Sequence, residues 1–314
     1  MSDVILVATH HGDPVAELVV SSLTRKGQKP YVVHTDALCQ RTTSFSFTHK
    51  NDSAILEYEE WKLDLATVGS AWYWRAVVKD ARNNSDVERE MQKTLMGIWE
   101  TVDETVWLNH PHIIKRTQNK LMQLRHAQKA GLRTIPTHTT NSIEILKEQA
   151  PEQLLIKMPG KGIVHKDLNL HVMYSTHLHK NSLAVVKANP FPGMYQPFLS
   201  KKKEWRITIV GDKVFSAAIY TDTNTKVDWR PDSHNEEAVR FVVEEFPAEA
   251  AQKCKKLLQI LDLRYGAFDF IETEDDELYF VEVNSNGQFL WLEKELGLPI
   301  SDAIADELIT IANS

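Results

Sequence analysis

The chain opens on alternating apolar and polar segments whose lengths fit strands and a helix. An apolar run covers residues 4–8. Asp13-Pro14 follows, which is typical of a helix start, because Asp caps free backbone N–H groups and proline is tolerated at the first helical position. We expect a helix over residues 15–27 and a second strand at 31–34. This β-α-β order predicts an open α/β domain over residues 1–115.

The middle of the chain has the pattern of a small subdomain over residues 116–190. A helix is predicted where Leu121, Leu124 and Ala127 share one face, and Gly131 stands at its expected end. A later strand at 154–157 runs into Met158-Pro159-Gly160-Lys161-Gly162, which we expect to be a loop because it is rich in glycine and lysine.

The last part, residues 191–314, combines strands with one amphipathic helix. Apolar runs at 206–210 and 213–219 flank Gly211-Asp212, a typical two-residue hairpin turn. A helix over 248–262 places apolar side chains on one stripe, which should pack on the sheet. Upstream, the aromatic cluster Trp72-Tyr73-Trp74-Arg75 is interpreted as interior packing or a hydrophobic rim.

Composition narrows the class of protein. The 314 residues are 42% hydrophobic and 25% charged, which is typical of a globular protein. The net charge of −7 argues against a general nucleic-acid binder, which needs a basic face. No apolar stretch reaches the roughly 18 to 20 residues of a membrane-spanning helix, and no signal peptide is recognisable. We therefore expect a cytoplasmic protein without nucleic-acid or membrane partners.

A pair of apolar arms near the C-terminus, residues 266–271 and 278–284, each contains a lone acid. If the hairpin folds symmetrically about the Asp275–Asp276 bond, Asp269 lies opposite Glu282. Asn284 lies on the same face as Glu282, since side chains alternate along a strand. Two carboxylates and an amide oxygen form a set suited to Mg²⁺. The alternative is that the acids face solvent and the symmetry is coincidental.

Several motifs resemble one branch of the ATP-grasp superfamily, the microviridin-type peptide ligases or graspetide synthetases, which are related to ribosomal-protein glutamate ligases. The resemblance implies an α/β ATP-grasp fold, in which an open α/β N-terminal domain is followed by two α+β subdomains that clamp ATP. It covers most of the chain from about residue 107 onward and is carried by Trp107-Leu108-Asn109-His110-Pro111, Asn119-Lys120-Leu121-Met122-Gln123-Leu124, Asp228-Trp229-Arg230 and Glu282-Val283-Asn284-Ser285-Asn286-Gly287-Gln288.

The resemblance also implies an ATP site. Lys120 and Lys157 match the two lysines that bind the nucleotide, and two ammonium groups from separate elements can neutralise a triphosphate. Glu204 is placed to take a ribose hydroxyl. The interdomain hinge, whose backbone would bind the adenine edge, matches Gln196, Pro197, Phe198 and Leu199.

Three further residues match the family's reaction centre. Arg206 and Arg230 correspond to arginines near the γ-phosphate and the substrate carboxylate, and Asp228 would orient Arg230 or contact the side of the substrate from which the nucleophile approaches. The reaction requires a carboxylate to attack the γ-phosphate, giving an acyl phosphate that a hydroxyl or amine then attacks. Planar, permanently charged guanidinium groups suit this chemistry.

The partner implied is a ribosomal precursor peptide with a leader and a core. Its leader would be recognised by the middle subdomain and the hairpin around Gly211-Asp212. The chain could act as a monomer or as a homodimer, and the sequence does not decide between these two states. Some branches carry a threonine where this chain has Glu204, which leaves ester and amide crosslinks both open. Two alternatives remain at this point: a ligase that adds glutamate or another amino acid to a protein tail or small peptide, and a non-catalytic ATP-binding module.

Overall fold

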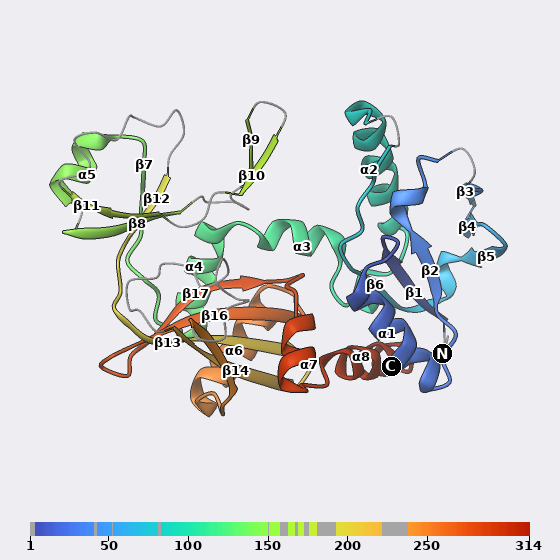
Figure 1. Cartoon of the computed structure of the whole chain (residues 1–314). Helices are drawn as coiled ribbons and strands as arrows, with labels where there is room; N and C mark the ends of the chain where they lie inside the picture. Colours follow the sequence, from blue (N-terminus) through green and yellow to red (C-terminus); the bar gives the residue numbers. More distant parts are fainter. Residues whose placement is uncertain are drawn as a thin grey trace.

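The computed structural model describes residues 4–40, 43–51, 53–80, 83–149, 151–157, 163–166, 169–172, 176–180, 193–221 and 238–314. Figure 1 shows three groups of elements in these ranges: an N-terminal α/β unit, a small middle unit around β8 and β12, and a C-terminal sheet with its helices.

The N-terminal unit is built on a parallel sheet in which β1 (Val4–Thr9) lies between β2 (Tyr31–His34) and β6 (Val68–Tyr73). α1 (Pro14–Arg25) begins where predicted, because the Asp13 carboxylate accepts hydrogen bonds from the next free backbone N–H groups. The unit is completed by β3 (Phe45–Lys50), β4 (Ser53–Tyr58), β5 (Trp61–Asp64), α2 (Ser85–Trp99), α3 (Pro111–Thr117) and the 3₁₀ turns Thr35–Ala37, Leu65–Thr67 and Glu104–Val106.

The middle unit contains an antiparallel sheet with the strand order β11-β8-β12-β7. α4 (Lys120–Ala130) precedes it and ends at Gly131, whose φ of 89° is left-handed and favours glycine. The predicted loop at 158–162 lies outside the described residues. The other elements are β7 (His138–Thr140), α5 (Ile143–Gln149), β8 (Gln153–Lys157), β9 (Ile163–Lys166), β10 (Asn169–Val172), β11 (Thr176–His179) and β12 (Gly193–Pro197).

The C-terminal unit is a five-stranded antiparallel sheet with the order β15-β14-β13-β16-β17. Val210 pairs with Lys213, which confirms the predicted two-residue turn at Gly211-Asp212. One face packs against α4 and α6, as the predicted apolar stripe requires. The elements are β13 (Lys201–Val210), β14 (Lys213–Thr221), β15 (Val239–Val243), α6 (Ala248–Ile260), β16 (Tyr265–Thr273), β17 (Leu278–Asn284), α7 (Leu290–Leu296) and α8 (Ile300–Ala312).

Trp72 and Trp74 join the first and last parts of the chain. Both are almost fully buried, at 2% and 1% exposure, which confirms the interior packing predicted for the aromatic cluster. Trp74 packs against Tyr265 and Phe289 with ring centroids 6.0 and 5.6 Å apart. α8 also lies against α1 (Figure 1), so a single apolar core spans the N-terminal unit and the C-terminal helices.

In the part of the chain that the structure describes, no helix combines the length and the apolar character needed to cross a membrane.

Candidate functional site

The sheet face opposite α4 and α6 is charged. Side chains alternate along β13, so Trp205 and Ile207 enter the helix-covered core while Glu204 and Arg206 point the other way. Arg206 is paired with Asp269 on β16, and Asp269 is paired with Glu282 on β17. One row across three strands therefore carries an arginine and two carboxylates on the same face.

The pairing of Asp269 with Glu282 confirms the predicted register, but the symmetric turn on which that prediction rested is wrong. Near the turn, Phe270 pairs with Phe280, and the Thr273 N–H donates to the Glu277 carbonyl at 3.0 Å. These contacts centre the loop on residue 275 itself. A register shift between Asp269 and Phe270, with an extra residue on β17, then restores the predicted pairs. Such a bulge re-aims side chains and is not evident from apolar periodicity.

The predicted metal ligands converge. Asn284 Nδ2 donates to Glu282 Oε1 at 3.1 Å. Each acid also has a cation beside it: Lys120 Nζ lies 2.9 Å from Glu282 Oε2, and Arg206 Nε lies 3.2 Å from Asp269 Oδ1. Carboxylates this close favour a positive charge between them. The donor set of two carboxylates and one amide oxygen therefore fits a hard cation such as Mg²⁺.

Arg206 has spare hydrogen-bonding capacity in the same place. Its side chain is 8% exposed, and its Nη1 is buried with no hydrogen-bond partner among the described residues. A buried guanidinium N–H without an acceptor is costly, and an anionic oxygen satisfies it. The side chain can therefore accept a phosphate or carboxylate oxygen as a partner, and the role predicted for this residue stays a prediction.

Lys157 meets the same cluster from the middle unit. It ends β8, pairs with Met194 of β12 and is half-buried. Burial lowers its pKa, the nearby Lys120 lowers it further, and Glu282, Glu204 and Asp269 partly oppose these effects. Two lysines from separate elements thus lie within electrostatic reach of the same acids. This arrangement suits a polyanion that would satisfy both ammonium groups.

The predicted hinge lies beside this cluster on β12 and the residues after it. Gln196 is 3% exposed; its Nε2 donates to Thr137 Oγ1 at 2.9 Å, and its Oε1 is buried without a partner among the described residues. The Phe198 N–H donates to the Gln153 carbonyl at 3.0 Å. Pro197 ends the strand, and Leu199 follows half-buried. Backbone and side-chain groups of the hinge, which is predicted to bind the adenine edge, are thus held in place by these hydrogen bonds.

Two other features of the predicted nucleotide pocket were decided only by packing. Glu204 forms an ion pair with Lys201, which is only 5% exposed. His177 was given no role in this pocket by the sequence interpretation. It pairs with Leu155, which pairs with Gln196, and its ring lies 4.4 Å from that of Phe198. Period-two alternation in β11 could have indicated its face, but not its neighbours.

Asp228 and Arg230 lie outside the described residues, so their predicted roles stay predictions.

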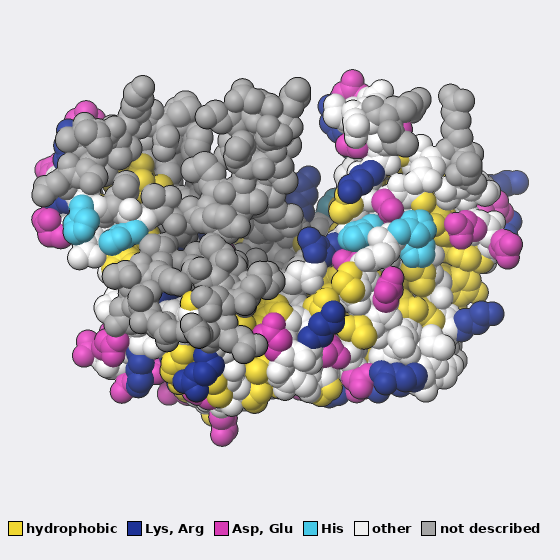
Figure 2. All heavy atoms as spheres, in the orientation of Figure 1, with side chains coloured by type: hydrophobic (Ala, Val, Ile, Leu, Met, Phe, Trp, Pro, Cys, Tyr) yellow, Lys and Arg dark blue, Asp and Glu magenta, His cyan; other side chains and the backbone are white. Residues whose placement is uncertain are grey.

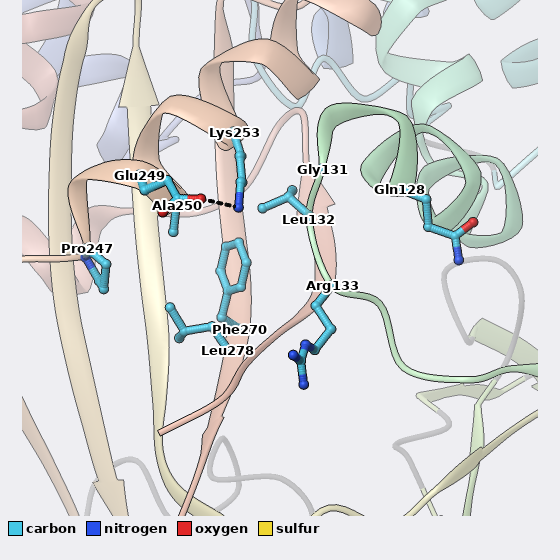
Figure 3. Close-up of a pocket in the computed structure, with 10 residues that line it drawn as sticks. All are labelled: Gln128, Gly131, Leu132, Arg133, Pro247, Glu249, Ala250, Lys253, Phe270 and Leu278. Carbon is cyan, nitrogen blue, oxygen red and sulfur yellow. Dashed lines mark ion pairs between the residues drawn. The ribbon is translucent and has the colours of Figure 1, made fainter. Parts of the chain in front are cut away.

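A separate cavity of about 610 Å³ lies on the helix-covered side of the same sheet. Figure 3 shows its lining, in which Lys253 and Glu249 of α6 form an ion pair near Phe270, with Arg133 opposite. None of the predicted site residues lines it. Phe270 points to the opposite face from its neighbour Asp269, so this cavity is distinct from the charged face.

Comparisons with known proteins concern the fold of the chain and its family resemblance. Residues 4–115 match the family described as the MvdD pre-ATP grasp domain. No curated protein matches the chain by sequence. Among solved structures, a RiPP-associated ATP-grasp ligase of Chryseobacterium gregarium, in complex with ADP and a leader and core peptide, is 27% identical, with 99% of this chain and 97% of that chain covered and a TM-score of 0.83.

Two macrocyclases of Microcystis aeruginosa MRC are similar as well. MdnB is 25% identical, with 97% of this chain and 98% of that chain covered and a TM-score of 0.73. MdnC, bound with its precursor peptide MdnA, is 23% identical, with 98% and 99% covered and a TM-score of 0.79, a likeness of fold. These comparisons confirm the ATP-grasp fold class and the resemblance to graspetide-type ligases.

Proposed function

We propose that this chain, an ATP-dependent ligase with the ATP-grasp fold, crosslinks the side chains of a ribosomal precursor peptide. Asp or Glu carboxylates of the peptide are activated as acyl phosphates and joined to Ser or Thr hydroxyls or Lys amines, giving a macrocycle. The observation that carries the proposal is the charged row Arg206–Asp269–Glu282, with Lys120 against Glu282 and Lys157 within electrostatic reach.

Each charged group has a task in this reaction. Lys120 and Lys157 bind the triphosphate, and the hinge and Glu204 hold the adenosine. Asp269, Glu282 and Asn284 would hold Mg²⁺, which would supply charge neutralisation for the phosphate oxygens. Arg206 orients the peptide carboxylate beside the γ-phosphate. By resemblance, Arg230 shares this task and Asp228 orients Arg230.

The bonds change in two steps. A carboxylate oxygen of the peptide attacks the γ-phosphorus, and the bond to ADP breaks. A hydroxyl oxygen or amine nitrogen then attacks the acyl carbon; inorganic phosphate leaves, and the nucleophile loses its proton. Arg206 serves both steps in this proposal, since a buried guanidinium can stabilise the anionic substrate and the developing charge.

The partner is a precursor peptide with leader and core segments, as bound in the C. gregarium ligase. The leader contacts the middle subdomain (116–190) and the β13–β14 hairpin of the C-terminal subdomain (191–314). The N-terminal domain (1–115) forms the rest of the enzyme. We assign the reaction to the cytoplasm, where ATP is available and where the thiols of Cys39 and Cys254 stay reduced.

The test uses the purified chain, Mg²⁺, ATP and a precursor peptide encoded beside its gene. We expect ATP hydrolysis to be faster with the peptide, and the peptide to lose one water mass for each crosslink. Hydroxylamine added during the reaction should trap the acyl phosphate as a hydroxamate. Omission of ATP is the control.

The outcomes separate the alternatives. A peptide that gains the mass of an amino-acid residue, when free glutamate is supplied, identifies an amino-acid ligase. ATP binding with no hydroxamate and no change in peptide mass identifies a non-catalytic module, and either result overturns the proposal.

A further inference from the structure

A second group of metal-ligating side chains lies in the N-terminal unit, apart from the charged sheet face. It consists of Glu100, His110 and His112. Glu100 follows the last residue of α2, His110 is the residue before α3, and His112 lies in the first turn of α3. Two imidazoles and one carboxylate therefore meet where the two helices come together.

The three side chains already converge without an ion. His112 Nδ1 lies 2.8 Å from Glu100 Oε1, and His110 Nε2 lies 3.6 Å from the same oxygen. One ligand atom of each residue lies within 4.8 Å of the ligand atoms of the other two. A tetrahedral zinc site with bonds of about 2.1 Å needs ligand atoms roughly 3.3–3.5 Å apart.

The surroundings give this group one fixed ligand and an open side. The His110 side chain is 9% exposed and packs edge-on against Trp107, with ring centroids 5.6 Å apart. The side chains of His112 and Glu100 are 52% and 46% exposed. An ion can enter from solvent, and water can complete its coordination, as in sites with three protein ligands.

We propose that Glu100, His110 and His112 bind a divalent transition-metal ion of the zinc type. Imidazole nitrogen and a single carboxylate favour Zn²⁺ over Mg²⁺, which prefers an all-oxygen set like that of Asp269, Glu282 and Asn284. The bound ion links the end of α2 to the start of α3. Because α3 leads directly into Lys120 of α4, it braces the segment that delivers this lysine to the charged face.

A simpler interpretation is that Glu100 forms ion pairs with His112 and His110 and nothing more. The gathering of one ligand atom from each of three residues within 4.8 Å of one another favours a three-ligand site. Metal binding has one local cost. His110 Nδ1 accepts a weak hydrogen bond of 3.3 Å from the His112 N–H, and this bond must be released, since a neutral imidazole has one lone pair.

The test is calorimetric titration of the metal-free full-length chain with Zn²⁺ in excess Mg²⁺, without ATP or peptide, so that its outcome is independent of the proposed function. We expect one ion per chain. E100Q and H112A should each weaken binding at least about tenfold, since each removes one of three protein ligands. Both positions are exposed, so these variants should fold. Substitution with Co²⁺ should give the visible absorption of a tetrahedral site in the unsubstituted chain and not in H112A.

Two matched variants complete the experiment. H49A removes an exposed histidine of β3 outside the group and should bind Zn²⁺ like the unsubstituted chain. D269A should also keep Zn²⁺ binding, which excludes occupation of the predicted Mg²⁺ site. Unchanged Zn²⁺ affinity in both E100Q and H112A, or loss of binding in D269A, would overturn the proposal.

Discussion

The two faces of the five-stranded sheet differ in what they contribute, although the same strands build both. Toward α4 and α6, the side chains of Ile207, Phe268 and Phe280 are fully buried. Toward the middle unit, Arg206, Asp269 and Glu282 form a charged row. The apolar face supplies stability through burial, and the charged face is held in place by it. A substitution on one face should therefore change a different measurement from a substitution on the other.

The largest expected effect comes from the apolar face. Phe280→Ala removes a fully buried ring and should lower the free energy of unfolding by about 3–5 kcal/mol. Urea unfolding followed by circular dichroism measures this loss. Val214→Ala on β14 is the matched control: its side chain is 37% exposed, so we expect a change within about 0.5 kcal/mol. Equal losses in the two variants would contradict the assignment of stability to the buried side chains of the apolar face.

On the charged face, a substitution should lower the activity much more than the free energy of unfolding. Glu282→Gln removes a predicted metal ligand and should lower kcat/KM for crosslinking by about 10²- to 10³-fold, because several kcal/mol of charge stabilisation are lost. Its free energy of unfolding should change by only about 1 kcal/mol, since the Lys120–Glu282 pair is partly exposed. Glu274→Gln, in the exposed hairpin turn, should leave both quantities unchanged. Full activity of Glu282→Gln would refute the metal assignment.

A smaller effect on the free energy of unfolding is expected from Lys157, and this effect depends on pH. Its pKa is lowered from 10.5 by burial and by Lys120, so the folded chain holds this proton less tightly than the unfolded chain. The charged Lys157 therefore destabilises the folded chain. This destabilisation is fully present below the folded-state pKa and is lost as pH rises from that value toward 10.5. Lys157→Met should lack this rise in stability with pH, as chemical denaturation at pH 7 and pH 10 would show.

The same substitution tests the nucleotide site. Lys157→Met should weaken Mg²⁺-ATP binding about 10- to 100-fold, the loss expected for one charge-assisted hydrogen bond. Calorimetric titration measures this affinity. Lys147 is an exposed residue of α5, so Lys147→Met serves as the control and should bind ATP like the unsubstituted chain. ATP affinity unchanged in Lys157→Met would remove this lysine from the site.

Local sequence predicted the elements well where a few neighbouring residues decide the outcome. Asp13-Pro14 begins α1, Gly131 ends α4, and Gly211-Asp212 turns β13 into β14. The pairing of Asp269 with Glu282 was predicted from a symmetric turn that the structure does not have. The bulge that restores this pairing was not predictable, since apolar alternation does not show which strand carries an extra residue.

By itself, the sequence therefore determined the α/β class and the turns and helix ends that near neighbours fix. It also named Asp269, Glu282 and Asn284, although their convergence on one face depends on a bulge that the sequence did not show. Only the tertiary structure decided which cations meet these acids: Lys120 from α4 and Arg206 from β13 contact them, and Lys157 from β8 lies within electrostatic reach. The packing of α8 against α1 and the meeting of Glu100 with His110 and His112 were decided in the same way. The physical reason is that capping, turns and alternation act between near neighbours in the chain, whereas these contacts join segments that only packing brings together.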